Sequence, residues 1–174
     1  MDDWLEDDVG PLADAGRAGR GLDQGMIREP IRLLNPRVPL TLPPGASCRD
    51  AIDVMRQHRV GCVLVEENGL LVGILTERDL LLKLEAWDVG RAIRDLMTPD
   101  PEALTPDTPI LYALNKMSVG GFRHVPLVDD AHRPVGIVSV KDIIDYIVDF
   151  FPNEVLTIAP DALRGERWHG RDGG

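Results

Sequence analysis

The chain contains the same pattern twice, with the second copy starting about 62 residues after the first. Ile31-Arg32 in the first copy returns as Ile93-Arg94, and Val72-Gly73-Ile74 returns, past one inserted residue, as Val135-Gly136-Ile137. A period of this length exceeds the roughly 20–50 residues of most solenoid repeats. It therefore indicates two small α/β units packed as a pair. Ligands often bind at such junctions, so the junction is where a binding site is expected.

Charge and hydropathy exclude several classes of partner. The 174 residues carry a formal net charge of −10 at pH 7, which argues against nucleic acid or an anionic membrane as a partner. No stretch approaches the ~20 consecutive apolar residues of a membrane span. The acidic N-terminus also lacks the apolar run of a signal peptide. We therefore expect a soluble, cytoplasmic protein with no nucleic-acid or membrane partner.

Both cysteines, Cys48 and Cys62, lie in apolar surroundings in the first copy. They lack CxxC spacing and have no histidine cluster nearby. Core packing is the expected role, with metal or redox chemistry as the alternative. No metal site is predicted.

The duplication divides the chain into four segments. Residues 1–30 are acidic and glycine-rich and are expected to form a flexible leader. The two copies occupy residues 31–92 and 93–152, and a short proline-punctuated stretch joins them. Residues 153–174 are expected to form a C-terminal tail.

Each copy predicts the element order β-α-β-β-α. In the first copy, Asn68-Gly69 is a strong signal for a hairpin between two strands. The paired strands are expected at residues 62–65 and 71–75 in the first copy, and at 125–128 and 134–138 in the second.

The first helix of each copy has a candidate N-cap. Ser47 precedes one helix, with Asp50 three residues later. Thr108 precedes the other, with Pro109 expected at the first helical position. Helix starts are thus predicted at matching places in the two copies.

The junction between the last strand and the last helix is also repeated. It reads Gly73-Ile74-Leu75-Thr76-Glu77-Arg78-Asp79 in the first copy and Gly136-Ile137-Val138-Ser139-Val140-Lys141-Asp142 in the second. The hydroxyl and the aspartate three residues later have the spacing of an N-cap box. The structural interpretation of the motif is therefore that it caps the last helix of each copy. The alternative is a nucleotide site, where helix N–H groups meet a phosphate and the carboxylate accepts from ribose hydroxyls. Arg78 and Lys141 would supply countercharge, and the glycines would let another group approach the backbone.

Two copies of about 60 residues, each ending in G-h-h-[ST]-x-x-D, resemble a tandem pair of cystathionine-β-synthase (CBS) domains, called a Bateman module. The resemblance covers residues 31–152. Asp95-Leu96-Met97-Thr98-Pro99 and His124-Val125-Pro126-Leu127-Val128-Asp129 support it. It implies an α/β (α+β) fold in which two repeats pack with pseudo-twofold symmetry around two nucleotide clefts.

The resemblance also assigns roles within those clefts. The hydroxyl and the aspartate of each motif would hold phosphate and ribose, and adenine would lie near the strand starts. The motif positions are Thr76 and Asp79 in one cleft, and Ser139 and Asp142 in the other. The strand starts are Cys62-Val63 and His124-Val125-Pro126.

The two copies differ at these strand starts. Arg123 and His124 place a cation and a titratable ring where the first copy has Gly61 and Cys62. They could meet a phosphate, or be a surface arginine and a strand-end histidine. We expect the cleft with Arg123 to bind more tightly. The candidate ligand-binding residues are Cys62, Val63, Thr76, Arg78, Asp79, Arg123, His124, Val125, Pro126, Ser139, Lys141 and Asp142.

The sequence predicts a regulatory module rather than an enzyme. No nucleophile elbow, P-loop or HExxH motif is present. The expected ligand is AMP, ADP, ATP or a related adenosyl compound, with Mg²⁺ as an optional companion of the phosphates, and the regulated partner is unknown. The alternatives are a dimerisation scaffold with degenerate clefts and an unrecognised enzyme. Apolar second-helix faces predict a homodimer through Leu80, Leu81, Leu82, Leu84, Ile143, Ile144, Ile147 and Val148.

Overall fold

The computed structural model describes residues 28–84 and 88–150, so nearly all of the expected leader and the whole of the expected tail lie outside the described residues. The first repeat contains β1 (Thr41–Leu42), α2 (Cys48–His58), β2 (Cys62–Glu67), β3 (Leu70–Thr76) and α3 (Glu77–Lys83). The second contains β4 (Thr98–Pro99), α4 (Ile110–Gly120), β5 (His124–Val128), β6 (Pro134–Ser139) and α5 (Val140–Phe150). Short 3-10 helices precede them, η1 (Ile31–Leu34) and η3 (Ile93–Asp95). Among the described residues, no helix is long and apolar enough to cross a bilayer.

The mixed α/β architecture and the repeated β-α-β-β-α order are confirmed. The Asn68-Gly69 hairpin is also confirmed, because both residues have positive φ (53° and 82°), as a two-residue type I′ turn requires. The hairpin sets an antiparallel register in which Cys62 lies opposite Thr76. In the second hairpin His124 lies opposite Ser139. Each strand start is therefore next to the junction that leads into the last helix.

The first helices begin differently in the two repeats. Ser47 is the N-cap of α2, as predicted, and forms a complete capping box with Asp50. The prediction of Thr108 as an N-cap is wrong, because Pro109 is the N-cap and α4 begins at Ile110. The Thr108 hydroxyl instead accepts the backbone N–H of Thr105 at 3.2 Å. The hydroxyl thus stabilises the preceding turn.

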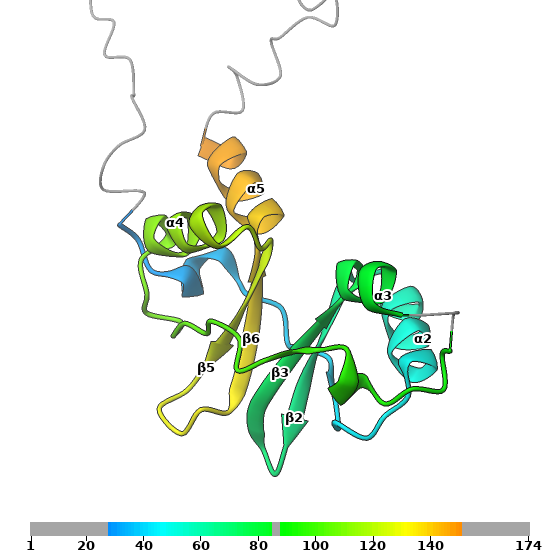
Figure 1. Cartoon of the computed structure of the whole chain (residues 1–174). Helices are drawn as coiled ribbons and strands as arrows, with labels where there is room; N and C mark the ends of the chain where they lie inside the picture. The colour runs from blue at the N-terminus through cyan, green and yellow to red at the C-terminus, as the bar shows by residue number, and fades with distance from the viewer. Residues whose placement is uncertain (1–27, 85–87, 151–174) are drawn as a thin grey trace, which may run out of the picture.

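The start of each sequence repeat packs on the other repeat. In η1, the backbone N–H of Ile31 donates to the carbonyl of Thr108 at 2.9 Å; in η3, Ile93 donates to Ala46 at 2.9 Å. Strand β4 pairs with β3 of the first repeat, although β4 lies within the second repeat in sequence. The matching stretch before β1 makes a bridge from Arg37 to Ile137 in β6. The two repeats are therefore interlocked (Figure 1).

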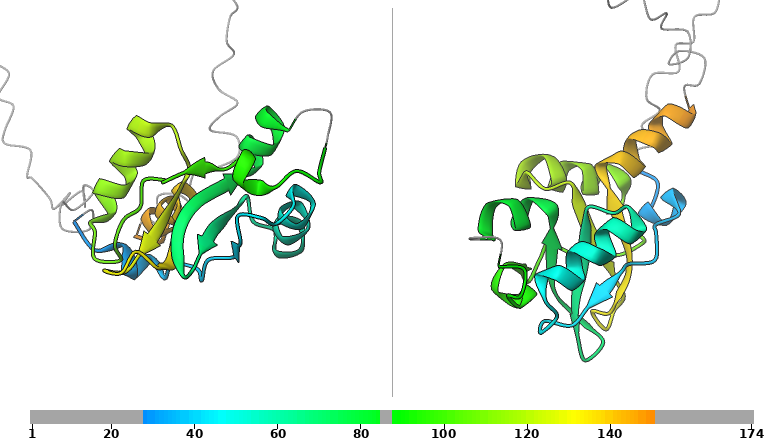
Figure 2. Two further views of the ribbon diagram at one scale, coloured as in Figure 1. Left: turned by 60° about the horizontal axis from the view of Figure 1, so that its bottom comes forward. Right: turned by 90° about the vertical axis from the view of Figure 1, so that its right-hand side faces the viewer.

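Three apolar clusters follow from this arrangement. Each repeat has its own core, and Ile31 belongs to the core of the second while Ile93 belongs to the core of the first. A third cluster joins the strands of the two repeats, which lie side by side with helices on both flanks (Figure 2). Cys48 lies in the first core and Cys62 in the third cluster, which confirms that both cysteines pack as apolar residues.

Two glycines of the repeated junction face the interlocked segments. A Cβ on Gly73 would collide with the side chain of Met97, which lies just before β4. A Cβ on Gly136 would lie 3.2 Å from Cβ of Pro36. The close approach that these glycines were expected to allow is therefore made by the chain itself.

Candidate functional site

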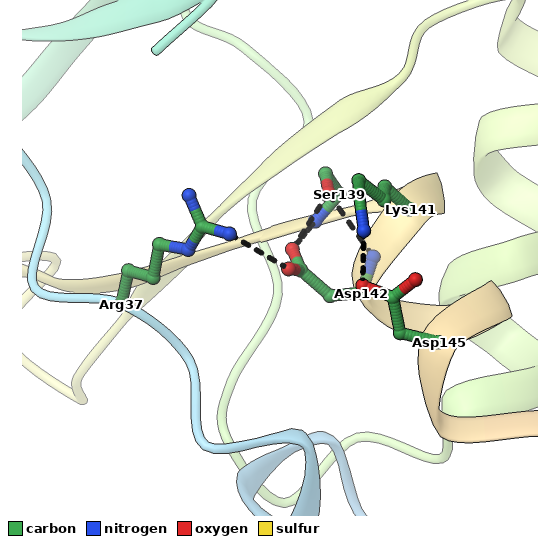
Figure 3. A network of polar contacts seen from close by, with 5 residues as sticks. All are labelled: Arg37, Ser139, Lys141, Asp142 and Asp145. Carbon is green, nitrogen blue, oxygen red and sulfur yellow. Dashed lines mark hydrogen bonds and ion pairs between the residues drawn. The ribbon is translucent and has the colours of Figure 1, made fainter. Parts of the chain in front are cut away.

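The two repeated junctions form the same hydrogen-bonded box. The Thr76 hydroxyl donates to Oδ2 of Asp79 at 2.6 Å, and the Asp79 N–H donates back to that hydroxyl at 3.2 Å. The Ser139 hydroxyl and Asp142 repeat this geometry at 2.6 Å and 3.2 Å. The structural interpretation is thus correct for α3 and α5, and Figure 3 shows the box at the start of α5. In each aspartate, Oδ2 accepts the capping bonds and Oδ1 remains outside the box.

A third capping box shows that capping alone does not mark a site. Ser47 and Asp50 at the start of α2 have the same bonds, at 2.7 Å and 3.1 Å. Asp50 lines neither of the clefts described below. What distinguishes Asp79 and Asp142 is that each lies at a cleft between the repeats.

The larger cleft, called here the Asp142 cleft, has a volume of about 680 Å³. The smaller, called the Asp79 cleft, has a volume of about 380 Å³. Both fall within or near the range of small-molecule pockets, ~300–1,000 Å³. Four residues border both clefts and form a shared wall: Gly61, Glu77, Arg123 and His124.

Most of the predicted ligand-binding residues lie at these clefts. Those at the Asp79 cleft are Thr76, Arg78 and Asp79. Those at the Asp142 cleft are Cys62, Ser139, Lys141 and Asp142. Arg123 and His124 border both. The expectation that Arg123 belongs to one cleft alone is wrong, because the strand starts of the two repeats meet between the clefts.

Val63, Val125 and Pro126 lie elsewhere. Val63 and Val125 are buried in the two repeat cores, and the Pro126 side chain is also fully buried. These three residues are absent from the walls of both clefts. Alternate residues of a strand face opposite sides, so a strand start can bring only some of its side chains to a cleft.

The remaining oxygens of the two aspartates differ in their partners. Oδ1 of Asp79 lies 2.6 Å from Nζ of Lys83, which also donates to the Leu96 carbonyl at 2.8 Å. Oδ1 of Asp142 lies 3.7 Å from the guanidinium of Arg37, whose side chain is 64% exposed. Figure 3 shows Arg37 reaching Asp142 from the segment before β1. Asp142 is therefore the more available acceptor.

The backbone donors of α3 and α5 are largely engaged. The N–H of Glu77 donates to the Gly61 carbonyl at 3.0 Å, and the N–H of Val140 donates to the Arg123 carbonyl at 3.0 Å. The aspartate N–H groups donate to the capping hydroxyls. A phosphate at either cleft would therefore depend on side-chain cations more than on helix N–H groups.

The cations near the clefts differ in how they are held. Arg78 donates to the Gly121 carbonyl at 3.2 Å, and Lys141 pairs with Asp145. The exposed Arg123 side chain has neither an ion pair nor a hydrogen bond within residues 28–84 and 88–150. Arg123 is thus free to turn toward a ligand.

Burial shifts the pKa values of two titratable side chains that line the clefts. Burial lowers the pKa of His124, as does the neighbouring Arg123, while Asp142 and Glu77 act in the opposite sense. Burial, with a contribution from Glu77, raises the pKa of the Cys62 thiol to about 12. His124 therefore favours the neutral ring, and Cys62 stays a protonated, unreactive thiol. Within the described part of the chain, no group of three or more metal-ligating side chains is present.

Several lining residues were missed by sequence reasoning. Arg37 and Arg59 line the Asp142 cleft, and Asp100 and Phe122 line the Asp79 cleft. Arg59 and Phe122 lie just before the aligned strand starts, and this position in the sequence could have identified them as cleft residues. Arg37 and Asp100 reach the clefts through the interlocked segments, which the sequence pattern does not reveal.

Comparison with known proteins places this geometry in a family. The family model described as the CBS domain matches residues 26–86 and 93–149. The CBS domain-containing protein CBSX3, mitochondrial, of Arabidopsis thaliana is 35% identical over 109 residues, which cover 57% of this chain and 52% of that protein. The matches span 32% to 65% of the lengths of the first three curated relatives.

Solved structures show the same fold. The CBS domain pair of protein MJ0100, in complex with 5′-methylthioadenosine and S-adenosyl-L-methionine, has a TM-score of 0.63 and 29% identity, covering 68% of this chain and 98% of that chain. The CBS domain protein PAE2072 from Pyrobaculum aerophilum, complexed with AMP, has a TM-score of 0.63 at 23% identity, covering 71% of this chain and 98% of that chain.

Proposed function

The chain belongs to the CBS domain family, and from that premise we propose that it is a regulatory module that binds adenine nucleotides or related adenosyl ligands between its two repeats. The observation that carries the proposal is the position of Asp142 and Asp79 at inter-repeat clefts. Each aspartate is fixed by a capping box through Oδ2. Oδ1 of Asp142 would accept ribose hydroxyl groups readily, whereas Oδ1 of Asp79 would have to share them with Lys83.

The chemistry of the Asp142 cleft suits each part of a nucleotide. Asp142 would accept the ribose hydroxyls, and Arg123 would engage the phosphate. Apolar side chains that line the Asp142 cleft, including Val60 and Cys62, would pack against adenine. The MJ0100 domain pair binds 5′-methylthioadenosine and S-adenosyl-L-methionine, which supports an adenosyl ligand for this chain. Mg²⁺ would accompany a di- or triphosphate rather than occupy a protein site.

A regulatory module needs a surface through which ligand binding affects another protein chain, and exposed apolar helix faces are candidates for that surface. Leu81 and Leu82 on α3 are 72% and 76% exposed, and Ile144 on α5 is 51% exposed. Leu80 and Ile143, expected on the same faces, are buried in the cores. We assign the exposed residues to a homodimer contact through α3 and α5. Sedimentation as a monomer at micromolar concentration, with and without nucleotide, would contradict the dimer.

A thermal-unfolding screen tests ligand binding directly. The ligands are AMP, ADP, ATP, S-adenosylmethionine and cyclic dinucleotides, with GMP as the matched control for base recognition. A ligand present at 100 times its dissociation constant stabilises the fold by about 2.7 kcal/mol, which raises the midpoint by several degrees. The proposal fails if no adenine compound raises it.

The second candidate function is a dimerisation scaffold without a physiological ligand. The exposed apolar residues of α3 and α5 are the observation that favours it. A dimer whose thermal midpoint responds to none of the screened ligands would support the scaffold. Turnover of a bound nucleotide would instead indicate an enzyme.

A further inference from the structure

The two clefts carry opposite formal charge. Within the described residues, the Asp142 cleft is lined by four cations and two carboxylates, and the Asp79 cleft by two cations and four carboxylates, which gives +2 and −2 with the histidines neutral. The charged residues of the first are Arg37, Arg59, Arg123, Lys141, Glu77 and Asp142. Those of the second are Arg78, Arg123, Glu77, Asp79, Asp100 and Glu102.

Ion pairs with residues outside the clefts reduce this contrast without reversing it. Lys141 pairs with Asp145. Asp79 pairs with Lys83 at 2.6 Å, and Glu102 pairs with Lys116 at 2.8 Å. When these paired groups are left out, the Asp142 cleft keeps a formal charge of +1 and the Asp79 cleft one of zero. The Asp142 cleft is thus the more positive on either count.

Two further observations favour the same cleft for a phosphorylated ligand. Asp142 faces the exposed Arg37 at 3.7 Å, whereas Asp79 is held at 2.6 Å by a lysine that is itself anchored to the Leu96 carbonyl. The Asp142 cleft is also the larger, with about 680 Å³ against about 380 Å³. It has both the room and the free cations that a phosphate needs.

We infer that the two clefts are sorted by ligand charge, an inference that rests on the proposed function. The Asp142 cleft takes an adenosyl ligand that carries phosphate, and the Asp79 cleft takes an adenosyl ligand without phosphate. The shared wall strengthens the sorting, because Arg123 can turn to only one cleft at a time. When a phosphate binds in the Asp142 cleft, Arg123 turns toward it. Arg78 is then the one cation among the described residues that line the Asp79 cleft, and its carboxylates disfavour a second phosphate there.

Calorimetric titration with AMP and with 5′-methylthioadenosine tests the inference on the full chain. We expect one AMP site per chain, with any second AMP bound at least about tenfold more weakly. Saturation with AMP should leave one site for 5′-methylthioadenosine. Asp142→Asn should remove the AMP site, and Asp79→Asn should leave it.

A variant with fewer carboxylates in the Asp79 cleft should gain affinity for AMP, a result that misfolding cannot produce. Asp100→Asn with Glu102→Gln removes two carboxylates from the Asp79 cleft, and Asp100 has φ 44°, which asparagine tolerates. This variant should strengthen AMP binding at the second site by about tenfold or more. Asp53→Asn with Glu67→Gln changes the total charge equally on exposed residues away from both clefts, and should leave that site weak.

The contrary outcomes are distinct. Two AMP sites of equal affinity, an AMP site lost with Asp79→Asn but kept with Asp142→Asn, or full displacement of 5′-methylthioadenosine by AMP would overturn the sorting and leave the proposed function intact. If neither compound binds, the proposed function and the inference both fail.

Discussion

The backbone N–H of Ile31 donates to the carbonyl of Thr108 at 2.9 Å, so the start of the first sequence repeat is attached to the second. The equivalent bond, from Ile93 to Ala46 at 2.9 Å, attaches the start of the second repeat to the first. Because each side chain also lies in the opposite core, neither repeat can complete its core alone. The interlock fixes the repeats and therefore the clefts between them.

Ile31→Ala tests the interlock. Ile31 is fully buried in the core of the second repeat, so we expect a loss of about 2–5 kcal/mol in the free energy of unfolding. Hydrogen exchange should show the lost protection in α4 and β5, far away in sequence. Leu33→Ala, on the same 3-10 helix at 46% exposure, should cost less than about 0.5 kcal/mol. Loss of protection in β2 and β3 instead would contradict the interlock.

Arg123→Ala should weaken nucleotide binding through the phosphate. A guanidinium–phosphate contact contributes about 1.5–3 kcal/mol, so AMP, ADP and ATP should bind roughly 10- to 150-fold more weakly, while adenosine is barely affected. Arg56→Ala, an exposed arginine of α2 outside both clefts, is the control in the calorimetric titration. An equal loss for adenosine would place Arg123 at the base or in the fold, and no loss would place it on the solvated surface.

His124 should make the folded state sensitive to mild acid. Its pKa in the folded protein lies below the ordinary 6.5, so the unfolded chain binds a proton that the folded chain resists. The contribution of the neutral ring is complete above about pH 6.5 and is lost as the pH falls toward the lowered pKa. Urea unfolding from about pH 8 to pH 5 should show a smaller acid loss for His124→Gln than for the wild type or the exposed-site control His58→Gln. Parallel curves for all three would rule out this role for His124.

The two cysteines should be unreactive in the folded protein. Burial raises the pKa of Cys62 to about 12 and also raises the pKa of Cys48. Little thiolate therefore exists at neutral pH, and both sulfurs are shielded. A chromogenic disulfide reagent at about pH 8 should label neither thiol in the native protein and both after unfolding. Rapid labelling of Cys62 in the native protein would contradict this expectation and show that the Asp142 cleft exposes its thiol.

The elements were predictable because local patterns determine them. Asn68-Gly69 fixes a hairpin, and Ser47 with Asp50 fixes a helix start, through bonds between near neighbours. The start of α4 was mispredicted because Pro109 can occupy either the N-cap or the first helical position. The local pattern favours the first helical position, which would make Thr108 the N-cap. The structure places Pro109 at the N-cap.

The clefts were only partly predictable because residues from distant segments line them. The repeated motif identified Asp79 and Asp142, since duplication placed both at equivalent junctions. Arg37 reaches Asp142 only because the segment before β1 pairs with β6, a contact between residues 100 positions apart. Periodicity within a repeat contains no information on such an exchange.

Calorimetric titration of AMP into the wild type, the double variant Asp79→Ala/Asp142→Ala and the control Asp50→Ala tests the central claim most directly. Each replacement removes the carboxylate half of a capping box of the same geometry, at about 1 kcal/mol of folding free energy, but only the first two aspartates line clefts. We predict that the double variant remains folded and does not bind AMP, and that Asp50→Ala binds AMP like the wild type. A folded double variant that binds AMP as tightly as the wild type would contradict the account.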